Sequence, residues 1–306
     1  MTRERRLVIA LGVNLVLVVG QIIFGVVAHS LGLMADAAHN LTDAAAVGLS
    51  LFAVHLTRRR ATAKRSFGYH RSTTLAAHAN AALLLLVTAV IVVEGIRRLL
   101  HPDVVHGGVV AIVASVALVL NLAAAALLLD GSHDLNMRSS LLHMLGDALA
   151  SAGVVLAGVV ILVVGGAYWL DPLISIVIGV IIGYQALHLL GQTTDVLLES
   201  TPAGLDISAL ALAMQSVEGV AAVHDLHVWT LSSDLYALSS HVIVDGHPTL
   251  EAARVVGERV KGVLRVEFHI DHATLELECE PCHESDHDPC GVNDVNALAS
   301  HTGHDH

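Results

Sequence analysis

LMADAAHNLTDAAAVGLSL at residues 33–51 and SSLLHMLGDALASAGVV at residues 139–155 share one pattern, a His followed four residues later by an Asp. The two pairs are His39 with Asp43 and His143 with Asp147. Four residues are slightly more than one helical turn, so each pair projects from a single helix face. Both stretches are otherwise apolar, where ionisable side chains are costly and usually functional. Two such helices can surround a tetrahedral cation.

Composition places much of the chain in a membrane. Of the 306 residues, 54% are hydrophobic and only 14% are charged, and the mean hydropathy is +0.68. These values exceed what the surface of a soluble protein tolerates. Apolar runs of about 20 residues, the length that crosses a hydrocarbon core, lie near residues 7–28, 31–56, 75–96, 107–129, 141–165 and 171–194. We therefore expect an all-α bundle of six transmembrane helices.

The distribution of charge predicts the orientation of this bundle. Residues 1–194 carry 12 basic and 9 acidic side chains, whereas residues 195–306 carry 4 and 19. Most of the basic residues of the first part precede the first run or lie between the second and third runs. Loops rich in Lys and Arg stay in the cytoplasm. With an even number of spans, we expect a multi-pass protein of the cell membrane with both termini in the cytoplasm.

The two His and Asp pairs together supply two imidazoles and two carboxylates. Two carboxylates cancel the charge of a divalent cation, which lowers the cost of burying it. Nitrogen and oxygen ligands in a tetrahedral array suit Zn²⁺ and tolerate Co²⁺ or Cd²⁺, whereas Mg²⁺ and Ca²⁺ prefer shells of more oxygen atoms. The predicted ligands of Zn²⁺ are His39, Asp43, His143 and Asp147.

Metal and protons compete for the same lone pairs in such a site, because a coordinating imidazole must be neutral at the bound nitrogen and a carboxylate must be ionised. Imidazole titrates near pH 6.5 in water. The hypothesis is therefore an exchange of Zn²⁺ for protons, with His39 and His143 as proton carriers. Asp36 and Asn40 lie on the same polar stripe. Orienting the ligands and hydrogen bonding between helices explain these two residues equally well.

Near Thr201 the long apolar runs give way to the pattern of a small soluble domain. Alternation of apolar and polar residues predicts strands at 222–231 and 236–244, with a hairpin between them. Helical patterns cover 206–217 and 249–263, and strand-like residues recur within 266–277. The order αββαβ predicts a small cytoplasmic α+β domain.

Potential metal ligands are dense in this domain and directly after it. The candidates are His224, His241, His269, Asp271, His272, Glu278, Cys279 and Cys282. A C-x₂-C pair is typical of zinc sites when a His lies nearby, although a solvated surface position explains any single His equally well. The Cys residues all lie on the part predicted to be cytoplasmic, which favours free thiols.

Short motifs in a fixed order cover nearly the whole chain. They are SLGLMADAAHNLTDA at 30–44, RSFGYHR at 65–71, NLAAAALLL at 121–129, LDPLISIVIG at 170–179, LLESTP at 197–202, VHDLHVWTLSS at 223–233 and HATLELE at 272–278. With them the chain resembles the cation diffusion facilitator family, in particular its zinc-exporting branch. The four membrane residues coincide with the transport site of that family, and a His at the first position is more similar to zinc-selective members.

The resemblance implies a homodimer, a proton-driven antiport of cytoplasmic Zn²⁺, a rocking motion of the bundle and a metallochaperone-like cytoplasmic fold. Zn²⁺ is then the transported substrate and a regulatory ligand, and no cofactor is expected. In the cytoplasmic domain the resemblance implies regulatory metal bound by one of two overlapping ligand sets. These are His224, His241, His269 and Asp271, or His241, His272, Glu278 and the Cys279/Cys282 pair.

The expected organisation has three parts: a six-span transport domain at 1–200, a metal-sensing and dimerising α+β domain at 201–280, and a mobile tail at 281–306. The tail is rich in His, Cys and Asp and lacks the apolar surface to build a core. Residues after 194 have a net charge of −15, so two such modules repel each other. Metal that bridges them would offset this repulsion.

Other functions are less compatible with these features. An intramembrane metalloprotease needs a catalytic Glu beside its ligands, and the sequence contains no H-E-x-x-H. The acidic soluble domain disfavours nucleic-acid binding. A membrane metal receptor or scaffold that does not transport remains the alternative to a transporter, and neither function is an enzyme.

Overall fold

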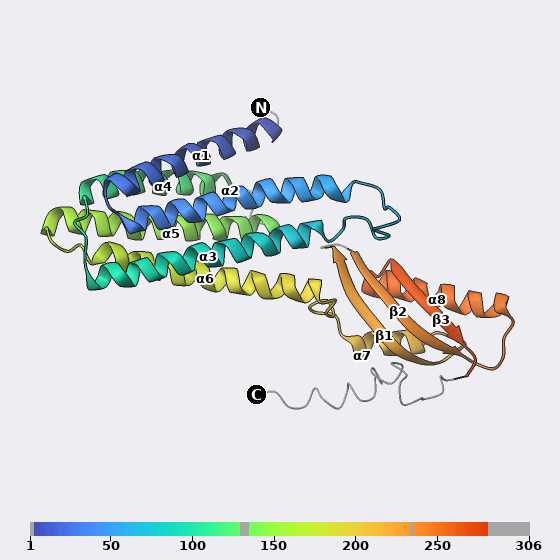
Figure 1. The fold of residues 1–306 in the computed structure, drawn as a ribbon. Coiled ribbons are helices and arrows are strands. Elements are labelled where there is room, and N and C mark those ends of the chain that lie inside the picture. The colour runs from blue at the N-terminus through green and yellow to red at the C-terminus, as the bar shows by residue number, and fades with distance from the viewer. Residues whose placement is uncertain (1–2, 129–134, 233–234, 281–306) are drawn as a thin grey trace. The chain divides into compact units, whose positions relative to one another are not determined.

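The computed structural model describes residues 3–128, 135–232 and 235–280. By their contacts the residues form two compact units (Figure 1). One unit comprises Met1–His55 and Ala76–Gly191, and the other comprises Leu56–Leu75 and Gln192–His306. The first unit is helical and carries the two His and Asp pairs, and the second contains the sheet.

Six helices account for the apolar runs. They are α1 (Arg3–Val27), α2 (Leu31–Thr57), α3 (Ser72–Leu100), α4 (Gly107–Leu128), α5 (Leu135–Val164) and α6 (Leu170–Leu197). Each overlaps its predicted range, so the helical bundle is confirmed. Among the described residues, α3 to α6 have segments long and apolar enough to cross a membrane, and the apolar segment of α1 is the shorter Asn14–Val27. Spanning by length and composition is thus shown for four of the six predicted helices.

The outer surface of the helical unit is apolar. On α3, for example, Leu86, Val90 and Val93 are 64, 61 and 67% exposed. Their spacing of four and three residues places them on one face of the helix. Exposed apolar side chains in such number are typical of a surface that contacts lipid.

Small residues hold α4 and α5 at very close distance. A Cβ atom added to Gly158 would lie 2.7 Å from the backbone nitrogen of Ala111 and 3.0 Å from the carbonyl oxygen of Gly107. Only a residue without a side chain allows the two backbones to approach this closely. The resulting contact fixes α5, and with it His143 and Asp147, against α4.

Asp171 joins the start of α2 to α6. Its position before Pro172 predicts a helix N-terminus, and it lies in the first turn of α6. The carboxylate, however, binds the N-terminus of another helix. It accepts hydrogen bonds from Leu31 N at 2.7 Å, Gly32 N at 3.3 Å and Ser30 Oγ at 2.5 Å, and Asp171 is 1% exposed. These bonds satisfy donors that the first turn of α2 leaves free, and a negative charge there is favourable.

The second unit has the predicted αββαβ order. Its elements are α7 (Ile207–Gln215), β1 (Val220–Ser232), β2 (Leu235–Val244), α8 (Leu250–Phe268) and β3 (His272–Glu278). β1 pairs with β2 in antiparallel orientation and β2 pairs with β3 in parallel. The α+β prediction is confirmed, with one correction. Residues 266–268, included in the predicted strand segment, end α8, because the helix continues until His269 adopts the left-handed conformation at φ 56°.

One face of this sheet forms the hydrophobic core. Leu238 and Val242 of β2 are fully buried and pack with Leu210 of α7 and with Val260 and Leu264 of α8. Side chains alternate along a strand, so Ser239 and His241 project from the opposite face. The second face is therefore available for polar side chains from all three strands.

Candidate metal centre

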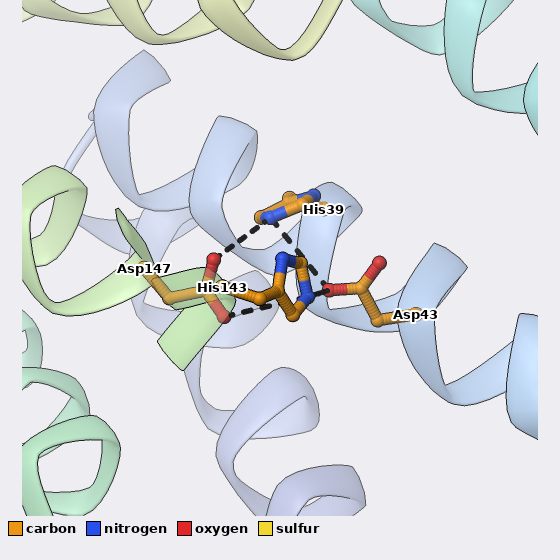
Figure 2. Close-up of side chains that lie close together, drawn as sticks. All are labelled: His39, Asp43, His143 and Asp147. Atoms are coloured by element: carbon orange, nitrogen blue, oxygen red, sulfur yellow. Dashed lines mark hydrogen bonds and ion pairs between the residues drawn. The ribbon is translucent and has the colours of Figure 1, made fainter. Parts of the chain in front are cut away.

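The structure brings the two His and Asp pairs together between α2 and α5 (Figure 2). The pairing runs crosswise between the helices. His39 Nε2 lies 3.1 Å from Asp147 Oδ1, and His143 Nε2 lies 3.2 Å from Asp43 Oδ2. The contacts within each helix are longer, 3.6 Å for His39 with Asp43 and 3.8 Å for His143 with Asp147. One ligand atom from each residue lies within 4.8 Å of the others.

The four side chains present the atoms that a tetrahedral divalent cation requires. Both Nε2 atoms face the carboxylate oxygens, and the two imidazole rings stand edge to face with centroids 5.9 Å apart. Hydrogen bonds between imidazole and carboxylate occupy the lone pairs that a metal would use, so a cation replaces protons at these atoms. Together the four residues offer two nitrogen and two oxygen ligand atoms.

Access to the cluster is unequal. The side chains of His39 and Asp147 are each 7% exposed, whereas those of Asp43 and His143 are 29 and 43% exposed. The first two residues close one side of the cluster, and the other two face a more open side. The cluster is therefore buried on the side of His39 and Asp147 and more exposed on the side of Asp43 and His143.

Asp36 and Asn40, which lie on the polar stripe of α2, form hydrogen bonds with residues of neighbouring helices. Asp36 accepts hydrogen bonds from Gln21 Nε2 of α1 and, at 3.4 Å, from Ser151 Oγ of α5. Asn40 donates to Gln21 Oε1 at 3.4 Å. Of the two interpretations of Asp36 and Asn40, the structure supports hydrogen bonding between helices. The sequence contained a weak indication of the partners, because Gln21 and Ser151 are polar residues in apolar spans.

A smaller group of possible ligands lies on the polar face of the sheet. His224 of β1 and His241 of β2 are paired across the ladder, and Glu278 of β3 bonds to both. The distances are 3.0 Å from His224 Nε2 to Glu278 Oε2 and 2.8 Å from His241 Nδ1 to Glu278 Oε1. The three residues are partly exposed and can offer ligand atoms within 4.8 Å of one another.

This group combines members of the two ligand sets implied by the resemblance and completes neither. His269 ends α8, and Asp271 pairs with Arg265 at 3.0 Å. The ring of His272 contacts that of Phe67, and Cys279 is exposed. Cys282 and the rest of the predicted tail lie outside the described residues. Within the described part of the chain, the fold therefore brings together His224, His241 and Glu278.

Comparison with known proteins identifies the family. A model of the cation efflux transmembrane domain matches residues 7–198, and a model of the cytoplasmic domain of cation efflux proteins matches residues 202–280. The chain belongs to the cation diffusion facilitator family. This family consists of multi-pass membrane transporters, and the second model is named for dimerisation. Both expectations from the sequence motifs, the family and its two domain types, are confirmed.

Several relatives are similar over most of their length. The zinc transporter ZitB of Escherichia coli is 36% identical over 307 residues, which cover 99% of this chain and 94% of that protein. The metal cation efflux system protein CzcD of Cupriavidus metallidurans is 35% identical, covering 92% and 89%. A cadmium, cobalt and zinc/H⁺-K⁺ antiporter of Bacillus subtilis is 32% identical, covering 84% and 83%.

Among solved structures, the metal-bound C-terminal domain of the CzcD transporter from Cupriavidus metallidurans is 30% identical to this member of the family. The match covers 24% of this chain and 99% of that domain, with a TM-score of 0.22.

Proposed function

We propose that this facilitator exports Zn²⁺ from the cytoplasm in exchange for protons, with Cd²⁺ and Co²⁺ as further substrates. The observation that carries the proposal is the crosswise cluster of His39, Asp43, His143 and Asp147 between two apolar helices. Its ligand types favour zinc over magnesium or calcium. The relatives named as transporters or efflux proteins of zinc, cadmium and cobalt support the same class of substrate.

Proton exchange follows from the chemistry of these ligands. Zn²⁺ that enters from the cytoplasm displaces protons from the imidazoles and needs both carboxylates ionised. On the opposite side of the membrane, protons compete for the same atoms and help to release the metal. His39 and His143 then carry protons back toward the cytoplasm. When Zn²⁺ is bound, the carboxylates of Asp43 and Asp147 keep the site neutral.

The charge of the loops supports a cytoplasmic position of the α+β domain, where it can respond to cytoplasmic zinc. The basic loop between α2 and α3 contains Arg58, Arg59, Arg60, Lys64 and Arg65 and favours the cytoplasmic side. Both termini then lie in the cytoplasm. We assign residues 1–200 to transport, 201–280 to sensing and homodimer formation, and 281–306 to a tail.

Flux measurements on the purified protein in liposomes test this function. With an imposed pH gradient, entry of Zn²⁺ should exceed that of Mg²⁺ and Ca²⁺, and collapsing the gradient with a protonophore should slow it. Zinc flux that does not depend on the pH gradient would contradict proton exchange. The absence of flux for every metal, with zinc still bound, would instead favour the non-transporting receptor or scaffold.

The group on the sheet predicts a second zinc ion per protomer. His241→Ala removes the residue that contacts Glu278 at 2.8 Å, so only two ligands remain. We expect the zinc content of the full-length protein, measured by metal analysis after equilibration, to fall by one ion per protomer, and activation of transport by cytoplasmic zinc to be lost.

The control for this variant is His247→Ala, which removes an exposed imidazole of the same domain and should leave the zinc content unchanged. An undiminished zinc content in His241→Ala would remove this group from the regulatory mechanism.

A further inference from the structure

His39 has a polar atom that the metal cluster does not use. Its Nε2 points at Asp147 and Asp43, and the other ring nitrogen is directed away from the cluster (Figure 2). Among the described residues this atom, Nδ1, is buried without a hydrogen-bond partner, and His39 is only 7% exposed. A metal-bound imidazole carries its proton on the second nitrogen, and that N–H normally donates to a fixed acceptor. His39 therefore needs an acceptor on the side away from the metal.

A small cavity lies beside His39. It has a volume of about 10 Å³ and is lined by residues of α2, α3 and α6, which is enough space for one water molecule. Apart from His39, its lining contains one polar side chain, that of Thr88 on α3, and the remaining side chains are apolar. His39 and Thr88 are thus the two polar side chains of the lining, and two partners are the minimum that a buried water requires.

Packing fixes the side chain of Thr88. Thr88 is 5% exposed. Cβ atoms added to Gly179 and Gly183 of α6 would lie 3.7 and 3.2 Å from its methyl group, Cγ2, so the methyl group points at two glycines. A β-branched residue in a helix has few rotamers, and the position of the hydroxyl follows from that of the methyl group. Even if the hydroxyl donates to its own helix, its lone pairs can still accept a hydrogen bond.

We propose that Thr88 is a positioning residue for the metal ligand His39, acting through one water molecule in this cavity. The water accepts a hydrogen bond from Nδ1–H and donates one to Thr88 Oγ1. This arrangement holds the proton on Nδ1, leaves the lone pair of Nε2 free for Zn²⁺, and fixes the ring orientation. The inference rests on the proposed function, because it assumes that the cluster binds the transported ion.

The substitution Thr88→Val tests the hydroxyl alone, since valine keeps the shape of threonine. Loss of a hydrogen-bond partner behind a ligating His typically costs about 10- to 100-fold in metal affinity. We therefore expect the KM for Zn²⁺ in liposomes to rise about tenfold, with the maximal rate much less affected. Thr88→Ser keeps the hydroxyl and should restore the KM, and a zinc-bound structure at high resolution should show the water.

Thr74→Val is the matched control, because it makes the same chemical change on α3, 14 residues from Thr88, and should behave as the wild type. A wild-type KM in Thr88→Val overturns the inference. Equal impairment of the Val and Ser variants also overturns it, since the methyl packing would then be responsible. Failure of the proposed function looks different: either the wild type moves no zinc, or His39→Ala still transports it. Failure of this inference alone leaves the wild type active and His39→Ala inactive.

Discussion

His143→Ala should reduce zinc flux in liposomes to the level of protein-free membranes. The substitution removes the nitrogen that lies 3.2 Å from Asp43 Oδ2 and leaves one imidazole and two carboxylates. Three ligands do not complete the tetrahedral shell of Zn²⁺. The measurement is initial uptake of zinc by proteoliposomes that contain equal amounts of folded protein.

His55→Ala is the control for this experiment, because His55 is an exposed His near the end of α2 and is remote from the cluster in sequence. It should transport as the wild type does. Asp147→Asn provides a second test, since it keeps the size of the side chain and removes one charge. The loaded site would then carry a net positive charge in the membrane, so flux should again be lost. Wild-type flux in either cluster variant would show that the transported ion is held elsewhere.

Asp171→Ala should destabilise the protein more than the loss of the exposed helix cap Asp206 does. The substitution leaves Leu31 N and Gly32 N without their buried acceptor, and each unsatisfied buried donor costs about 1–3 kcal/mol. We expect the free energy of unfolding to fall by about 3 kcal/mol. The midpoint of thermal unfolding in detergent should decrease, and zinc flux should decrease with it because α2 carries two of the ligands.

Asp206→Ala offers a matched comparison. Asp206 caps α7 with hydrogen bonds from Ser208 N at 2.8 Å and Ala209 N at 3.1 Å, but these groups are exposed. Water replaces the lost acceptor there, so the cost should be about 1 kcal/mol, typical of an N-cap. If Asp171→Ala shifts the thermal midpoint no more than Asp206→Ala does, the bond between α6 and α2 does not hold the site helix in place.

Local sequence patterns predicted the helices and strands well, because these elements depend on residues that are close together in the sequence. The ranges of the six helices and the αββαβ order were accessible from apolar runs and alternation. The end of α8 was not, because the three residues Val266, Glu267 and Phe268 fit a strand as well as a helix. Only the left-handed residue His269 and the bond from Ile270 N to Leu264 O end the helix there.

The group of His224, His241 and Glu278 shows why the sequence alone does not identify the members of a site. His224 and Glu278 are 54 residues apart in the sequence and meet because β3 lies parallel to β2 in one register. A shift of one residue would turn Glu278 to the other face. The sequence therefore supplied eight candidates without a means of choosing among them, and among the described residues the strand register brings three of them together.

For the membrane site, the sequence by itself determined that His39 and Asp43 share a helix face, as do His143 and Asp147, because a four-residue spacing is a property of any α-helix. The tertiary structure decided that each His meets the Asp of the other helix and that Thr88 lies behind His39. These contacts depend on the depth and rotation of α2, α3 and α5 relative to one another. Packing at Gly158 holds α5 against α4, and the bonds of Asp171 hold the start of α2 against α6. Neither contact follows from the spacing of residues along a single helix.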